Sequence, residues 1–437
     1  MSLQLEIPVM PSPVAMIRSA WTRLSVAGLV ATLIGNGIGR FAFVALMPAL
    51  INARWFTKGE ASQLSVATLL GYIIGAWRSD RLARRCSEAT LIRWCMLLIS
   101  LSFFASAISD AWFAWYYAWR LVAGACGAVL MVLPAPLVVP RYELAIRGRV
   151  SGLVFSGVGF GAALSGVLVP ALVSGFGHTV IWGDTFVPMA LRGVQGAWLG
   201  LGMFCLALTL VSWRAWPREP AHSLTRAEGP SPVDDEPDEE RARVRKIERR
   251  IFLAHALNAV GYLAHTMFWV DYLVRELGMT LAAGGVYWSL FGIGAAAGPM
   301  LAGRLADLFG TKRCLLVGFL VKAGAALLPA CTTNGVALGA SALLMGVCTP
   351  GLVTLVSAYT LETVGPTRNR STWGSATFSF SLAQGVGGFL MATFAANASS
   401  YRPLFVMSAV ALVGSAICIA RSKDQTSGTR EEEQALG

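Results

Sequence analysis

The chain has 437 residues, of which 55% are hydrophobic and only 14% are charged, and its formal net charge at pH 7 is +11. Soluble domains carry about 25% charged residues, and the fraction of surface that a fold can hide from water rises only slowly with chain length. The composition therefore excludes an ordinary soluble globular protein and indicates a membrane protein with several spans.

Apolar runs of the right length follow one another along the whole chain. A membrane-spanning helix needs about 20 mostly apolar residues. Twelve such runs occur, at residues 24–52, 61–77, 94–109, 112–139, 151–174, 193–213, 251–274, 283–303, 314–331, 335–360, 373–396 and 403–420. They are continuously apolar and do not alternate with a period of two, which favours helices over a β-barrel. We expect an all-α membrane protein with twelve transmembrane helices.

Lysines and arginines are distributed unevenly between the segments that join these runs. With the N-terminus placed inside, 27 of the 35 lie in inner segments, 5 lie in outer segments and 3 lie within runs. Inner loops of membrane proteins carry such an excess. This bias predicts cytoplasmic N- and C-termini in the cytoplasmic (inner) membrane. It also explains the net charge without nucleic acid as a partner. The first run is too long for a cleavable signal.

A polar stretch divides the chain near its middle. Residues 214–250 contain the acidic block VDDEPDEE followed by RARVRKIERR. We interpret them as a cytoplasmic loop, the alternative being a short helix that lies on anionic headgroups. The expected units are then a first bundle at 1–213, a second bundle at 251–421 and a cytoplasmic tail at 422–437.

The two halves of the chain show a weak internal repeat. The first and seventh runs match at an offset of 222 residues, which pairs Asn36 with Asn258 and Arg40 with Tyr262. Basic loops after runs two and four match the loops after runs eight and ten at offsets of 221 to 227. Matches in the same order along the chain predict a pseudo-symmetric arrangement of six plus six helices.

Several motifs resemble the major facilitator superfamily. The loop GRLADLFGTK at 303–312 resembles its G-x-L-A-D-R-x-G-R-K/R motif, with Leu308 and Thr311 in place of basic residues. The segment AWRSDRLARR at 76–85 is a looser copy, and Arg120-x-x-x-Gly124 is similar to an R-x-x-x-G signature of that superfamily. The segments GIGRFAFVALMP and GYLAHTMF look like its YbfB/YjiJ-like branch.

This resemblance implies two six-helix bundles that rock about a central site near the bilayer midplane, lined by runs one, four, seven and ten. It also implies that the loop aspartates steady one conformation, since closing a gate needs interactions made in only one state. The implied gating residues are Asp80, Arg81, Arg84, Arg85, Asp307 and Lys312. The alternative is that these charges only fix the orientation of the chain.

The segment GNGIGRF at 35–41 places Arg40 about 16 residues into the first run. A cation at the bilayer centre costs about 2.5–3.5 kcal/mol on insertion scales. No Asp or Glu falls in the middle of any run, so Arg40 and Arg120 have no evident acidic partner. A guanidinium suits carboxylate, sulfonate or phosphate groups, which predicts an organic anion as the cargo. The alternative is that both arginines bind backbone carbonyls or reach the outer interface. Lys322 is expected to snorkel or pack.

The seventh run carries polar and aromatic residues at steps of four, three and four, which places them on one helical face. Such a face predicts a cavity wall, unless the aromatic rings pack against a neighbour and the histidine binds a carbonyl. The expected substrate-binding residues are Arg40, Asn36, Phe43, Arg120, Asn258, Tyr262, His265 and Trp269. His265 is also a candidate for proton coupling. The other possibilities are protonation of the cargo and exchange against a counter-anion.

These features predict a secondary active transporter that moves a small organic solute, an organic anion, by alternating access. An alternative is a proton-coupled exporter of amphipathic or drug-like compounds, and a further one is a membrane sensor or intramembrane enzyme. The runs contain no pair of acids and no Ser/His arrangement, and the eight cysteines have no metal-ligand spacing. We therefore expect no enzymatic activity, no metal and no cofactor, with the substrate and the lipid bilayer as partners.

Overall fold

The computed structural model describes residues 21–143, 146–175, 193–217 and 238–422. Regular structure within these residues is helical, and eleven of the helices are long and apolar enough to cross a membrane. The expected all-α membrane fold is confirmed. Residues 61–77, the remaining predicted span, lie in the 28-residue helix α4 (Lys58–Arg85), which is not among the eleven. Serines, glycines and Gln63 lower its hydropathy, so the count of twelve stays a prediction.

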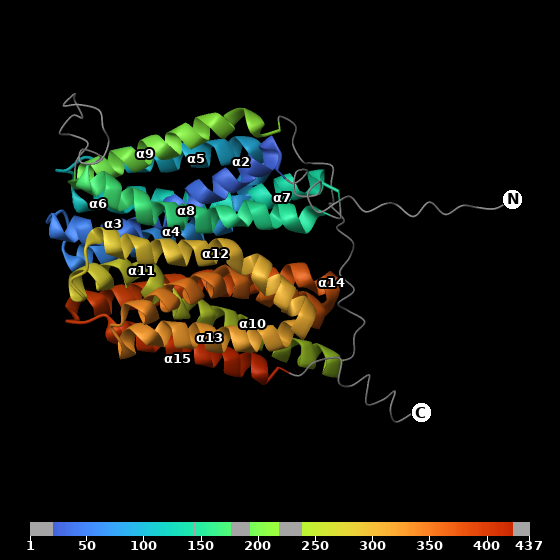
Figure 1. Cartoon of the computed structure of the whole chain (residues 1–437). Helices are drawn as coiled ribbons and strands as arrows, with labels where there is room; N and C mark the ends of the chain where they lie inside the picture. Colours follow the sequence, from blue (N-terminus) through green and yellow to red (C-terminus); the bar gives the residue numbers. More distant parts are fainter. Residues whose placement is uncertain (1–20, 144–145, 176–192, 218–237, 423–437) are drawn as a thin grey trace, which may run out of the picture.

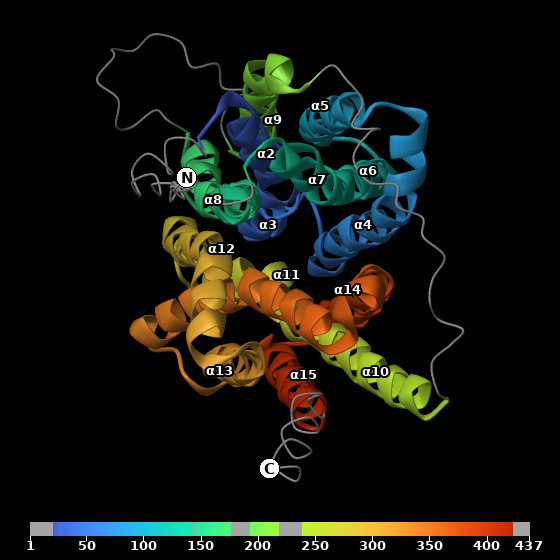
Figure 2. The ribbon, with the colours of Figure 1, turned by 90° about the vertical axis from the view of Figure 1, so that its right-hand side faces the viewer.

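The first helix group is made by elements that precede residue 218 and pack against one another. They are α2 (Arg23–Thr32), η1 (Leu33–Ile38), α3 (Ala42–Asn52), α4, α5 (Glu88–Ser106), α6 (Phe113–Val132), α7 (Pro134–Val138), η2 (Val139–Arg141), α8 (Arg147–Ser174), α9 (Gly193–Ser212) and η6 (Trp213–Ala215). In Figure 2 these helices, blue to green, gather on one side of the molecule.

The second helix group follows residue 237 and gathers on the other side, coloured yellow-green to red (Figure 2). Its elements are α10 (Asp238–Gly261), α11 (Leu263–Asp271), η7 (Tyr272–Glu276), α12 (Leu281–Phe309), α13 (Thr311–Cys331), α14 (Gly335–Asn397) and α15 (Arg402–Ala420). Gly365, with a φ of 74°, bends α14 into two spans. Helix α10 begins at Asp238, inside the stretch expected to be a loop. Most of that stretch, with the tail after 422, lies outside the described residues.

The helices of the molecule run between two ends. The basic end holds the chain segments 78–93, 141–143, 146–149, 304–313 and 421–422, and the opposite end holds 53–58, 107–112, 276–280 and 397–402. Figure 1 shows the long helices running between these ends, with the start of α2 and the end of α15 on the right, at the basic end. The placement of the basic end in the cytoplasm stays a prediction.

The two helix groups meet closely toward the opposite end. Helices α8 and α12 approach through small residues, because a Cβ added to Gly292 would lie only 2.1 Å from the Ala163 nitrogen. Ser289 donates a hydrogen bond of 2.8 Å to the Ala163 carbonyl across this seam. Lys58 Nζ donates to the Ala398 carbonyl at 2.9 Å and lies 4.1 Å from the centre of the Tyr401 ring. Direct hydrogen bonds thus join the groups at this end.

Contacts between the groups become sparse toward the basic end. A Cβ on Gly152 of α8 would meet only Met300, at 3.8 Å. One turn further along α12, a Cβ on Gly303 would meet nothing within 4 Å, and the same holds for Gly374 of α14. The described hydrogen bonds between the groups therefore lie at the centre and toward the opposite end, and the space beside Gly303 and Gly374 is open toward the basic end.

The first helix of each group is interrupted at matching positions. In the first group the segment η1 is a π-helix, in which Gly39 N–H donates to the Ile34 carbonyl at 2.8 Å. In the second group Tyr262 separates α10 from α11. Interruptions of this kind are frequent at functional sites because they re-aim side chains and free backbone groups. The glycines of GNGIGRF therefore do more than allow close packing, because this segment contains most of the π-helix that interrupts the first helix.

Candidate functional site

Arg40 lies where the two helix groups meet, next to the π-helical segment. Its Nη2 donates a hydrogen bond of 2.9 Å to the Tyr262 hydroxyl, and both terminal nitrogens lie 3.4 Å from Gln384 Oε1. The Tyr262 hydroxyl also donates to Gln384 Oε1. Arg40 is half-buried, whereas Gln384 is fully buried and its Nε2 has no partner. Residues matched by the internal repeat, Arg40 and Tyr262, thus touch each other across the interface.

Arg120 is anchored inside the first group. Its Nη1 donates to the Gly39 carbonyl at 3.0 Å, and its guanidinium carbon lies 4.6 Å from the centre of the Phe43 ring. The side chain is 4% exposed, and its Nε has no hydrogen-bond partner. Asn36, its neighbour on η1, donates from Nδ2 to the Gly127 carbonyl at 3.0 Å. This geometry favours the structural alternative for Arg120, which supports the turn that carries Arg40.

Lys322 is the residue whose position departs most from expectation. Its neighbours Leu320 and Val321 are 54% and 38% exposed, yet Lys322 is fully buried. Its Nζ donates to Asn258 Oδ1 at 2.9 Å and lies 5.4 Å from the centre of the Tyr262 ring. The side chain therefore points into the second group and does not snorkel to an interface.

His265 and Trp269 point away from Arg40, into the core of the second group. The His265 Nε2 lies 3.0 Å from Ser341 Oγ, and its ring stacks on Trp269 with the centroids 4.6 Å apart. Both rings also contact Phe405 edge-on. Of the four residues predicted to share one face of the seventh run, Asn258 and Tyr262 lie at the centre. The other two favour the packing alternative.

Within the described residues, no carboxylate balances the three central cations. Arg40, Arg120 and Lys322 form no ion pair with any Asp or Glu that the structure describes. Asp271, the acid nearest the middle of a span, pairs with Arg275 at 3.3 Å and accepts a hydrogen bond from Tyr401 toward the opposite end. An unbalanced positive charge in a low-dielectric setting attracts an anion strongly. The central site can therefore bind a small anionic group through guanidinium, hydroxyl and amide donors.

The predicted gating residues lie at the basic end, where the groups are apart. Asp307 is exposed on α12, with no ion pair or hydrogen bond to another described residue. Arg81 stacks on Trp77 at 5.1 Å, and Arg85 is exposed. Lys312 donates to the Ser422 carbonyl at 2.6 Å. The side chains of Asp80 and Arg84 lie outside the described part of the structure. The gating role stays a prediction.

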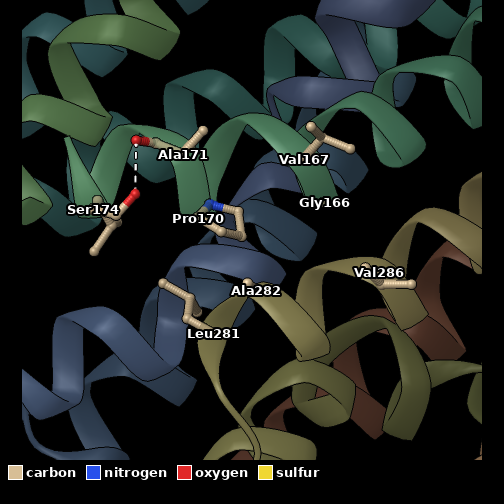
Figure 3. A pocket seen from close by; sticks show the side chains of 9 residues that line it. Gly166, Val167, Pro170, Ala171, Ser174, Leu281, Ala282 and Val286 are labelled. Carbon is tan, nitrogen blue, oxygen red and sulfur yellow. Dashed lines mark hydrogen bonds between the residues drawn. The ribbon is translucent and has the colours of Figure 1, made fainter. Parts of the chain in front are cut away.

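A separate pocket lies near the opposite end, between α8 and α12. It measures about 460 Å³ and is lined almost entirely by apolar groups. Figure 3 shows Val167 and Pro170 of α8 facing this space, with Leu281 and Val286 of α12 across from them. Val167 and Val286 are about 60% exposed on the molecule's side. The pocket contains none of the central polar residues, so it is separate from the cluster around Arg40.

Comparisons with known proteins agree with this architecture. A profile of the family described as "Uncharacterised MFS-type transporter YbfB" matches residues 32–420. No curated protein matches the chain by sequence. Among solved structures, a bacterial homolog of the human lysosomal transporter Spinster, inward-facing and unoccupied, has a TM-score of 0.67 at 18% identity, covering 94% of this chain and 97% of its own.

A mutant of the nucleoside transporter NupG is also similar, with a TM-score of 0.70 at 12% identity. The match covers 91% of this chain and 99% of the NupG chain. Identities this low show a shared fold and carry no information about cargo.

Proposed function

The chain belongs to the YbfB-type family of major facilitator superfamily transporters, and from that premise we propose that it moves a small organic anion across the cytoplasmic membrane by alternating access. The family supports a membrane transporter that carries a small molecule. The observation that supports an anion is the set of central cations, Arg40, Arg120 and Lys322, without a carboxylate partner among the described residues.

Arg40 is the proposed cargo-binding group. It is half-buried, and its longest hydrogen bonds, at 3.4 Å to Gln384, are at the weak limit. A carboxylate, sulfonate or phosphate would replace that contact with two short charge-assisted bonds. The Tyr262 hydroxyl and the unpartnered Gln384 Nε2 are further donors within reach of the same anion. Arg120 positions the Gly39 carbonyl and so the Arg40 turn.

The proposed cycle separates the two helix groups alternately at the two ends. In the described state the groups are joined at the opposite end and apart at the basic end. With the basic end in the cytoplasm, this arrangement is inward-facing. The transition breaks the Lys58 and Ser289 bonds and brings Asp307 into a closed gate. The twelve-span count, the six-plus-six division and the direction of net transport belong to this proposal.

The alternative of a proton-coupled exporter of amphipathic or drug-like compounds is less well supported for a cationic cargo. Such a cargo would meet like charges at the centre, where Arg40, Arg120 and Lys322 have no carboxylate partner among the described residues. A sensor or intramembrane enzyme is less well supported, because the family is one of transporters.

The experiment is counterflow in liposomes that contain the purified full chain. Radiolabelled benzoate, succinate and methylphosphonate serve as anionic probes, and labelled ethidium serves as the cationic probe. The proposal expects exchange of at least one anion and none of ethidium. Exchange of ethidium alone, or no exchange by protein with a normal thermal midpoint, overturns it.

A further inference from the structure

Lys322 and Asn258 form a buried pair that the binding of an anion at Arg40 does not by itself explain. The ammonium is fully buried and makes one described hydrogen bond, to Asn258 Oδ1 at 2.9 Å. An ammonium has three donors, so most of its bonding capacity is unused. Burial of a charge under these conditions is costly, and a purely structural role would be filled better by an apolar residue. The pair therefore calls for a functional explanation.

Tyr262 connects this pair to the proposed anion site. The centre of its ring lies 5.4 Å from Lys322 Nζ and 5.7 Å from the Arg40 guanidinium carbon. The two cations are thus no more than about 11 Å apart, the sum of those distances, in a setting of low dielectric. Each positive charge raises the cost of the other unless an anion is present. A change in the charge of Lys322 consequently changes the electrostatic potential at Arg40.

The chemistry of the three central cations differs in one respect. A guanidinium keeps its proton in proteins, whereas a lysine ammonium can release one. Asn258 suits both states of Lys322, because its Oδ1 accepts from the ammonium while its Nδ2 has no partner. When the proton leaves Nζ for water, the neutral amine offers a lone pair. A flip of the amide then lets Nδ2 donate to it.

Other titratable groups also face Lys322. His255 comes from α10, Tyr262 lies between α10 and α11, His265 comes from α11 and Cys348 comes from α14. His255 is held between the rings of Phe380 and Trp373, and His265 is tied to Ser341. Packing confines these two rings. The Lys322 ammonium, by contrast, adjoins the Asn258 amide, which can accept a hydrogen bond from the charged form and donate one to the neutral form.

We propose that Lys322 is a proton-carrying site, loaded when an anion binds at Arg40 and unloaded when the anion leaves, so that anion and proton move together. This inference rests on the proposed anion transport. In each cycle one N–H bond forms at Nζ from a water-borne proton and is broken again after release of the anion, with Asn258 reversing its amide.

The test uses liposomes that contain the full chain and a pH-sensitive dye, with labelled benzoate, succinate and methylphosphonate as probes. The parent is expected to accumulate its anion when a pH gradient is imposed and to change the internal pH in step. For Lys322→Arg, gradient-driven accumulation is measured relative to exchange by the same protein at symmetrical pH. This ratio is expected to fall about tenfold or more, because a guanidinium cannot release the proton. Lys246→Arg, the same substitution at an exposed position of α10, is the matched control.

Asn258→Asp provides an independent variant of nearly equal size if Lys322→Arg fails to fold. The carboxylate would hold the proton on Lys322 and is expected to lower the same ratio of gradient-driven accumulation to exchange at symmetrical pH. Unchanged accumulation in either folded variant, or anion movement by the parent without any pH change, overturns the proton site and leaves anion transport intact. Absence of anion exchange in the parent overturns the proposed function itself.

Discussion

The two helix groups hold their buried cations on different kinds of partner. In the first group Arg120 donates to a main-chain carbonyl, that of Gly39, which cannot rotate or exchange roles. In the second group Lys322 donates to the side-chain amide of Asn258, which can present either an acceptor or a donor. The difference suggests that the first group supplies a fixed positive charge and the second an adjustable one.

The matching asparagines show how the repeat has diverged. Asn36 and Asn258 occupy equivalent positions, 222 residues apart. Asn36 uses its Nδ2 to join η1 to α6 through the Gly127 carbonyl, at 3.0 Å. Asn258 uses its Oδ1 for Lys322 and leaves Nδ2 without a partner. One amide thus serves packing, while the other is available for a change of state.

The largest effect is expected at Arg40, the fixed charge that we propose binds the cargo. Arg40→Ala removes the guanidinium from the interface, and loss of a hydrogen-bonded buried charge costs about 2–4 kcal/mol, or roughly 30- to 1,000-fold in affinity. Arg40→Lys keeps the charge but loses the bidentate geometry, so it should fall between Ala and the parent. Anion exchange by the three proteins measures the series. Equal exchange by all of them would reduce Arg40 to a structural residue.

A second large effect is expected from the seam that joins the groups. In Gly292→Ala the new Cβ would lie 2.1 Å from the Ala163 nitrogen, so α8 and α12 must separate near the opposite end. Overpacking of this kind costs about 1–3 kcal/mol, which shifts the balance toward the state open at that end. Distance measurements between spin labels on α8 and α12 report the shift.

The matched control for the seam is Gly303→Ala, in the same helix, where an added Cβ meets nothing within 4 Å. It should leave the distance distribution unchanged. If both alanines shift the distribution equally, the effect arises from helix propensity and the seam does not set the conformational balance.

A smaller effect is expected where the two groups communicate. Tyr262→Phe removes the hydroxyl that joins Arg40 to Gln384 while keeping the ring beside Lys322. Loss of one such hydrogen bond costs about 1 kcal/mol, or roughly fivefold in anion affinity. Tyr262→Leu also removes the ring and should additionally weaken the dependence of exchange on pH. Identical behaviour of the two variants would mean that the ring does not link the sites.

Hydropathy and charge distribution were sufficient to predict the all-helical membrane fold, because the bilayer imposes length and polarity on every span. Arg40 is predicted as a central residue because a cation in the middle of a span costs free energy whichever way its side chain points. For Lys322 both snorkelling and packing were left open, because a run alone does not tell which helical face turns inward, and Leu320 and Val321 beside it do face outward. Gln384 carries no charge and lies among small residues, so composition gave no reason to select it. The π-helix at η1 depends on packing against α6 and α8.

The smallest effect on transport is expected at His265, the histidine first considered for proton coupling. His265→Asn loses the stack on Trp269 but keeps a polar group near Ser341, so the folded protein should be destabilised by about 1–3 kcal/mol. Gradient-driven accumulation should stay within about twofold of the parent, because the ring lies in the core of the second group and away from Arg40. Thermal midpoints and dye-monitored uptake separate these two outcomes. If the variant had parental stability but moved no protons, His265 and not Lys322 would be the proton-carrying residue. The adjustable charge of the second group would then lie on the face of α11 that packs against Phe405.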